Sequence, residues 1–69
     1  MTTIKDRIYA HRIAKRIHEI MVRIDALSAT NLDNVCEREP LVMQGDAIIA
    51  SIPENLRDMV NAEWRRLYA

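Results

Sequence analysis

A heptad repeat of apolar residues is the feature of this sequence that most limits its fold. Its positions are spaced by 3, 4, 3, 4 and 3 residues: Ala10, Ile13, Ile17, Ile20, Ile24 and Leu27. This spacing places one apolar stripe along an α-helix and predicts a helix from about Ile4 to Ser28. Thr2 or Thr3 can cap it, with Asp6 in the first turn, where the helix dipole favours an acid. A helix of about 37 Å in so short a chain must be the scaffold on which the other segments pack.

The segment after this helix contains turn and helix-stopping signals. Residues 28–33 form a predicted turn, in which Thr30 followed by Asp33 resembles a capping box. That box opens a predicted short helix through Arg38. The helix is expected to end before Pro40, because the residue that precedes a proline avoids the α-helical conformation.

Residues 41–50 fit two structures. They can form a tight hairpin that turns at Gly45-Asp46, or a loop followed by a short helix capped by Asp46. We favour the short helix, because an isolated two-stranded hairpin is only marginally stable.

A final helix is predicted to run to about Tyr68. Ser51 and Glu54 have the spacing of a capping box, and Pro53 lies in the first turn, where proline is tolerated. Apolar residues follow at helical spacing: Leu56, Met59, Val60, Trp64 and Leu67. Glu63 is the one residue that interrupts this stripe.

The whole sequence predicts an all-α fold in one domain, residues 1–69. The expected architecture is an antiparallel helical hairpin of the long N-terminal helix, a short helical turn region and the C-terminal helix.

A chain of 69 residues is marginally stable alone, and disulfides, metals or oligomers usually supply the missing stability. Cys36 is the single cysteine, and with His11 and His18 it lacks the spacing of metal ligands. We therefore expect no cofactor and a homodimer whose hairpins form a helical bundle.

Two apolar stripes are predicted to meet as the core or as a dimer seam. Their members are Ile13, Ile17, Ile20, Ile24, Leu56, Val60 and Trp64. A second apolar patch, Ile4, Ile8 and Val22, lies on the far side of the first helix. It indicates either a second contact or isolated exposed residues, which are common on protein surfaces.

Charge is unevenly distributed along this neutral chain. Residues 1–30 hold six basic and three acidic residues (+3), and residues 31–69 hold four basic and seven acidic residues (−3). Four basic residues lie within about 40° of one another on the helix wheel. They are Lys5, Arg12, Arg16 and Arg23, which we name the basic ridge and predict to contact a partner.

Three partners of the basic ridge are compatible with the sequence. It can track nucleic-acid phosphates, meet an acidic protein surface, or pair with acids of the same chain such as Glu54, Asp58 or Glu63. Zero net charge counts against nucleic acid, because dedicated binders are usually basic overall.

The sequence lacks catalytic constellations, and we predict that the protein is not an enzyme. A single glycine, Gly45, cannot build a phosphate-binding loop. Cys36 has no histidine nearby in sequence and is expected to be a half-buried structural thiol. His11 and His18 lie about 10 Å apart along the helix and are expected to be solvated.

Hydropathy predicts a cytoplasmic protein with no membrane partner. Charges interrupt every apolar stretch of the chain, and the N-terminal segment lacks the apolar core of a signal peptide.

The chain resembles the small helical proteins that phages use to redirect their hosts. Two segments carry this resemblance: IKDRIYAHRIAKRIHEIMVRI and DAIIASIPENLRDMVNAEWRRL. Among these phage proteins, the chain is similar in size and layout to the anti-quorum-sensing proteins of Mu-like Pseudomonas phages. The resemblance implies a viral inhibitor, dimeric in the host cytoplasm, that binds a quorum-sensing transcription regulator and blocks its DNA binding, with a pilus-assembly ATPase as a second target. It transfers no functional residue by motif.

A plasmid-encoded RNA-binding helical hairpin dimer has a similar outline. This second resemblance implies the alternative function, a nucleic-acid-binding regulator that uses the basic ridge.

Overall fold

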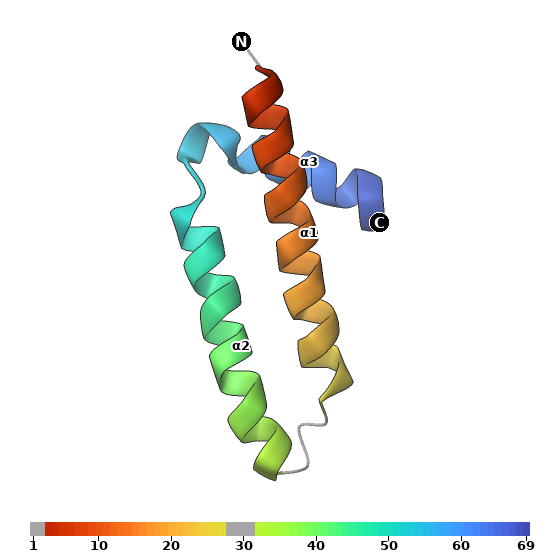
Figure 1. The fold of residues 1–69 in the computed structure, drawn as a ribbon, viewed down its shortest axis with the longest axis vertical. Helices are drawn as coiled ribbons and strands as arrows, with labels where there is room; N and C mark the ends of the chain where they lie inside the picture. Colours follow the sequence, from red (N-terminus) through yellow and green to blue (C-terminus); the bar gives the residue numbers. More distant parts are fainter. Residues whose placement is uncertain (1–2, 28–31) are drawn as a thin grey trace.

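The computed structural model describes residues 3–27 and 32–69, and this part of the chain contains helices and no β-strand (Figure 1). The elements are α1 (Ile4–Ala26), α2 (Leu32–Ser51), the 3₁₀-helix η1 (Glu54–Leu56) and α3 (Arg57–Tyr68). The predicted all-α class is confirmed. The predicted caps at Thr2 and Thr30 lie outside the described residues.

The predicted long N-terminal helix is present as α1, and a capping box starts it. Oγ1 of Thr3 accepts a hydrogen bond from the backbone N–H of Asp6 at 3.1 Å, and the Thr3 N–H donates to the Asp6 carboxylate at 3.5 Å. Asp6 also places a negative charge at the positive end of the helix dipole, and Arg23 places a positive charge in the last turn. These local signals explain why the start of α1 was predictable.

One continuous helix, α2, spans residues 32–51, so the predicted break at Glu39-Pro40 is wrong. Residues 41–50 form neither the hairpin nor the favoured loop followed by a short helix, because the whole segment is helical. A proline inside a helix removes a backbone hydrogen bond and costs about 3 kcal/mol. Here the backbone carbonyl of Cys36 loses its hydrogen-bond partner, because Pro40 has no N–H. Both residues are exposed. That carbonyl can therefore be hydrated, and packing of the flanking turns against α1 outweighs the local cost.

The predicted capping box of Ser51 and Glu54 is also wrong. The Ser51 hydroxyl donates to the backbone carbonyl of Ile48 at 2.7 Å, so this serine completes the last turn of α2. Pro53 precedes η1 and makes no side-chain cap. The final helix therefore begins later than the sequence indicates, at Arg57, and ends where it was predicted, at Tyr68.

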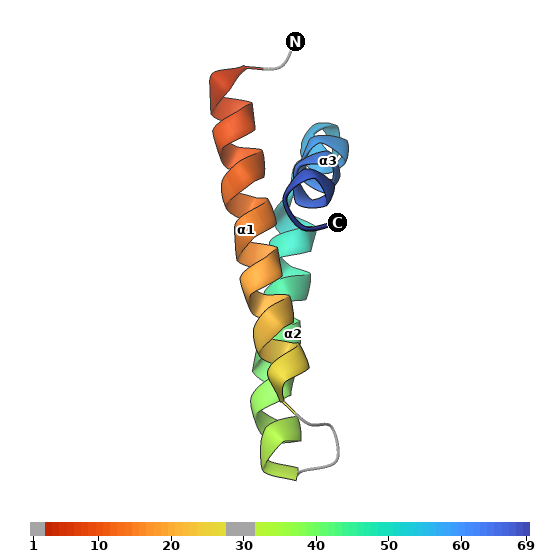
Figure 2. The same ribbon diagram turned by 90° about the vertical axis from the view of Figure 1, so that its right-hand side faces the viewer.

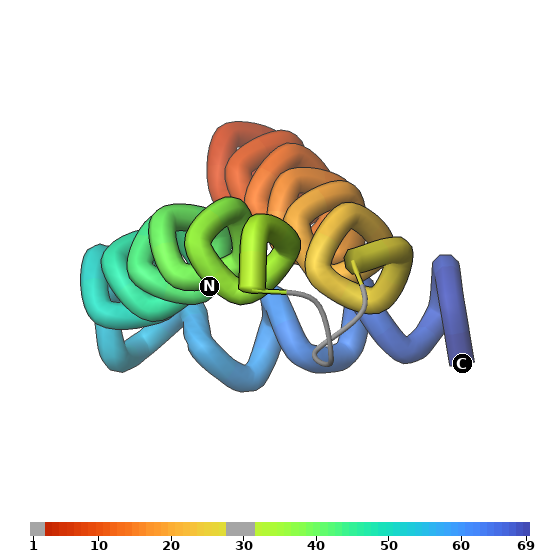
Figure 3. Tube along the Cα trace, turned by 90° about the horizontal axis from the view of Figure 1, so that it is seen from below, coloured from red at the N-terminus to blue at the C-terminus, as the bar shows by residue number. Residues whose placement is uncertain are grey.

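The helices are arranged in two layers. α1 and α2 lie side by side and run in opposite directions, and α3 crosses one face of this antiparallel pair (Figures 1 and 2). In the view along the long axis, α3 lies beneath the layer formed by α1 and α2 (Figure 3). α3 covers only the end of the pair near the start of α1. The long neighbour of α1 is therefore α2, and not the C-terminal helix.

The protein is thin and elongated for its length. Its principal extents are 47 × 22 × 14 Å and its radius of gyration is 13.8 Å, against about 11 Å for a compact chain of this size. It exposes 5398 Å² of surface, whereas size scaling gives about 4,450 Å² for a folded monomer of this mass.

The core lies where α3 crosses α1. Ala10, Ile52 and Val60 are buried together, and five half-buried side chains pack around them: Tyr9, Ile13, Ile17, Leu56 and Met59. Ala10 and Ala14 have almost no exposed surface, since their small side chains let α3 approach the α1 backbone closely. Among the other residues predicted as core or seam, Ile20 is buried, and Ile24 and Trp64 are half-buried.

The charge asymmetry of the sequence corresponds to the pairing of α1 with α2. α1 carries a net charge of +3, while α2 holds four acids and one base for a net −3. Three acids and three bases balance each other from Ile52 onward. The opposite charges therefore fall on the two helices that lie side by side.

Gly45→Ala tests the contact between α2 and α1. A Cβ at residue 45 would lie 3.7 Å from Cγ2 of Ile20, an ordinary contact distance. Because glycine in a helix is less favourable than alanine, we expect this change to raise the free energy of unfolding by about 0.5–1 kcal/mol. Urea unfolding followed by circular dichroism, at one fixed protein concentration, measures the change. Gly45→Leu should instead destabilise, and a destabilised Gly45→Ala protein would contradict the packing described.

Candidate functional site

Three rings join α3 to α1. The His18 ring stacks on Tyr68 with centroids 3.6 Å apart and planes 5° apart, and Trp64 lies tilted at 6.3 Å from His18 and 5.9 Å from Tyr68. His18 is half-buried, so the prediction that it is solvated is wrong. Its Nδ1 and the Trp64 Nε1 are buried without a hydrogen-bond partner in the described part of the chain. We name these residues the ring cluster.

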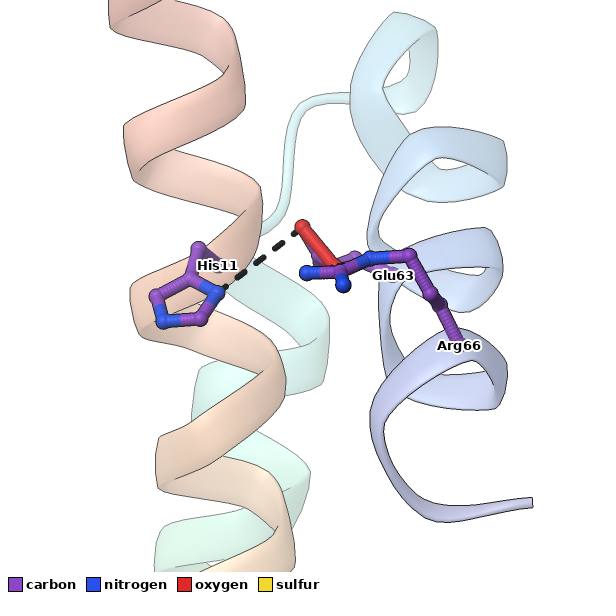
Figure 4. A network of polar contacts seen from close by, with 3 residues as sticks. All are labelled: His11, Glu63 and Arg66. Carbon is purple, nitrogen blue, oxygen red and sulfur yellow. Dashed lines mark hydrogen bonds and ion pairs between the residues drawn. The ribbon is translucent and has the colours of Figure 1, made fainter.

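A polar contact between the same two helices lies beside the ring cluster. Nδ1 of His11 is 3.8 Å from Oε2 of Glu63, and Arg66 donates to the other carboxylate oxygen, Oε1. Figure 4 shows His11 and the Glu63 carboxylate facing one another between α1 and α3. The Glu63 side chain is only 17% exposed. This contact explains why an acid interrupts the apolar stripe of α3, and it makes His11 a second histidine that is not fully solvated.

The basic ridge is exposed along its whole length, since Lys5, Arg12, Arg16 and Arg23 are all exposed. Arg16 forms an ion pair with Glu19 at 3.6 Å, with the two side chains 53% and 59% exposed. Such exposed pairs contribute only about 0–1 kcal/mol. Arg16 can therefore leave Glu19 for a partner at little cost.

α3 leaves the basic ridge uncovered. Lys5 and Arg23 lie about 27 Å apart along the axis, and the ridge is more than about 100° around α1 from His11 and His18, which meet α3. Glu63, an expected intrachain partner of the ridge, instead contacts His11 and Arg66. Over residues 3–27 and 32–69, no ion pair links the ridge to Glu54, Asp58 or Glu63.

A hollow of about 390 Å³, which we name the junction hollow, lies where the three helices meet. Its lining is Ile17, Met21, Ile49, Ile52, Arg57, Val60, Asn61 and Trp64. Most of these side chains are apolar, so the hollow suits an apolar group rather than an ion. Sequence reasoning missed it, because Ile49 was assigned to a segment without a defined partner.

Two further sequence predictions concern exposed side chains. Cys36 is exposed, so the prediction of a half-buried thiol is wrong. Pro40 is exposed as well, one turn farther along α2. All three residues of the predicted apolar patch, Ile4, Ile8 and Val22, are exposed.

Residues 3–27 and 32–69 provide neither a cluster of metal ligands nor a membrane-spanning helix. They contain no group of three or more His, Cys, Asp or Glu side chains placed to hold a metal ion. None of their helices combines the length and apolar character that a membrane crossing requires.

Comparisons with protein families, with curated proteins and with solved structures find no match. Two surfaces of this chain are therefore the candidate functional sites: the basic ridge and the apolar surface around the junction hollow.

Substitutions of His18 test whether the ring cluster holds α3 in place. His18→Phe keeps a ring in the stack and removes the unpaired Nδ1, so we expect equal stability or a gain of about 1 kcal/mol. His18→Ala removes the neighbour of Tyr68 and Trp64 and should cost about 1–2 kcal/mol. Denaturation followed by the fluorescence of Trp64, the only tryptophan, measures both. Unchanged stability of His18→Ala would show that the stack does not fasten α3.

Proposed function

We propose that this protein is a small dimeric modulator that binds another protein through the basic ridge of α1 and has no catalytic activity of its own. The observation that carries the proposal is the ridge itself. Four cations extend over about 27 Å of one helix side, all exposed and not covered by α3. An acidic surface on a partner would complement them and steer the two proteins together.

The charge distribution favours a protein partner over a nucleic acid. The chain is neutral overall, and the +3 charge of α1 is balanced by the −3 charge of the neighbouring α2. Its field therefore attracts anions close to the ridge, whereas dedicated nucleic-acid binders attract phosphates with a large net positive charge. A protein patch with a few carboxylates matches this local field.

The resemblance to anti-quorum-sensing phage proteins gives the first candidate partner. We propose that the partner is a transcription regulator in the cytoplasm of a bacterial host, and that binding of this protein inhibits the regulator. The dimeric state is proposed from the size of the chain and from its large exposed surface, 5398 Å², since small domains often gain the missing stability by association.

Charge reversal tests the ridge. Arg16→Glu with Arg23→Glu should lower recovery of the partner by at least about tenfold, because two attractions become repulsions at one surface. The matched control is Lys15→Glu with Arg65→Glu, which changes the net charge equally at two exposed sites off the ridge. Affinity purification from a bacterial lysate with quantitative mass spectrometry gives the recoveries, and purified candidate regulators give the dissociation constants.

Two results would count against this function. Equal partner recovery by the ridge variant and by wild type would exclude the ridge as the contact. A gel shift of DNA or RNA that weakens steeply as salt is raised above about 50 mM would replace the protein partner with nucleic acid.

A further inference from the structure

We infer that two copies of this chain join through an apolar stripe on α2. The stripe consists of Val35, Val42 and Ile49, extended by Met21 of α1, and we name it the α2 stripe. The inference rests on the dimer proposed above and identifies the surface that forms it. The heptad seam of α1 does not serve this purpose, because Ile13, Ile17 and Ile20 pack inside one chain.

α2 exposes many apolar side chains that no other part of the single chain covers. None of its 20 residues is buried. Of the nine large hydrophobic side chains exposed in the described residues, five belong to α2: Leu32, Val35, Val42, Met43 and Ile49. Such a density of exposed apolar residues on one helix of a small protein marks a contact surface.

The α2 stripe continues the face that α3 covers. Val35, Val42 and Ile49 are seven residues apart, so they lie nearly in line along α2. Ile49 and Met21 line the junction hollow beside α3. Val35 and Val42 line a second hollow of about 370 Å³ farther along α2, where α3 no longer covers the antiparallel pair (Figures 1 and 2). The stripe therefore connects two hollows on one open face.

The exposed area corresponds to what a stable dimer needs. The chain exposes 5398 Å², which is about 950 Å² more than a typical monomer of its mass. A stable interface of standard size removes about 800 Å² from each partner. One self-interface on this face would thus bring the surface of each chain close to that of an ordinary folded protein.

The chemistry of the stripe favours a second copy as its occupant. Arg38 borders it on one side, and Glu39 and Asp46 border it on the other. The surface is therefore apolar with a rim of mixed charge, as expected of a homodimer interface, which is more apolar than other contacts. Leu32 and Met43 lie beyond the two acids on the helix wheel and fall outside the stripe. The basic ridge lies at least about 140° around α1 from Met21 and stays free for its own partner.

Val42→Glu tests the interface, and Val22→Glu is its matched control. The two valines are 43% and 51% exposed, so neither change disturbs the core of one chain, and each adds one negative charge to a helix surface. Analytical ultracentrifugation should show wild type and Val22→Glu as dimers with dissociation constants within about threefold of each other. Val42→Glu should raise the dissociation constant by at least about 100-fold, because a charge without a partner would be buried.

The outcomes separate the interface from the proposals on which it rests. A wild type that remains monomeric at high concentration would overturn both the dimer and its interface. A dimeric, folded Val42→Glu protein would overturn the α2 stripe and leave the dimer standing. If circular dichroism shows that Val42→Glu is unfolded, hydrogen exchange of the wild type at low and high concentration decides: protection gained over residues 35–49 supports the stripe, and protection gained only elsewhere overturns it. The ridge variant Arg16→Glu with Arg23→Glu should remain dimeric throughout.

Discussion

The burial of α1 on two of its sides is the constraint on which the rest of the structure depends. α2 and α3 both pack on α1, and Ala10, Ala14 and Ile20 of α1 are three of the five buried hydrophobic residues in the described chain. The other two, Ile52 and Val60, join Ala10 in the core. Because one helix provides the contact surface for both others, loss of its apolar stripe would leave neither of them with a partner. The small side chains at residues 10 and 14 set how closely α3 can approach.

The sequence predicted the elements whose signals are local. Thr3 and Asp6 define the start of α1 through hydrogen bonds between residues three apart, and the apolar stripe ending near Tyr68 defines the last helix. It failed over α2, because Pro40 and Ser51 carry strong local signals that long-range packing overrides. The exposure of the basic ridge followed from its position on the helix wheel. The role of His18 did not, because its ring partners lie some fifty residues farther along the chain.

The two surfaces of interest are chemically distinct and separated on the molecule. The basic ridge is charged, exposed and distant from α3, whereas the α2 stripe is apolar and shares its face with α3. With this separation, the proposed self-association and the proposed partner contact would not compete for one surface. If two copies associate as proposed, the apolar surface that each chain exposes to water would be covered by that association.

The position of the basic ridge has a consequence for the strength of binding. In a dimer joined through the α2 stripe, each chain keeps its own ridge, so the assembly is bivalent. A partner that is itself two-fold symmetric could engage both ridges, and the second contact would then form at a high effective concentration. Modest attraction at each ridge, of the kind that four exposed cations provide, would become tight binding through avidity. A monomeric partner would gain no such increase, and selectivity for symmetric targets would follow from geometry alone.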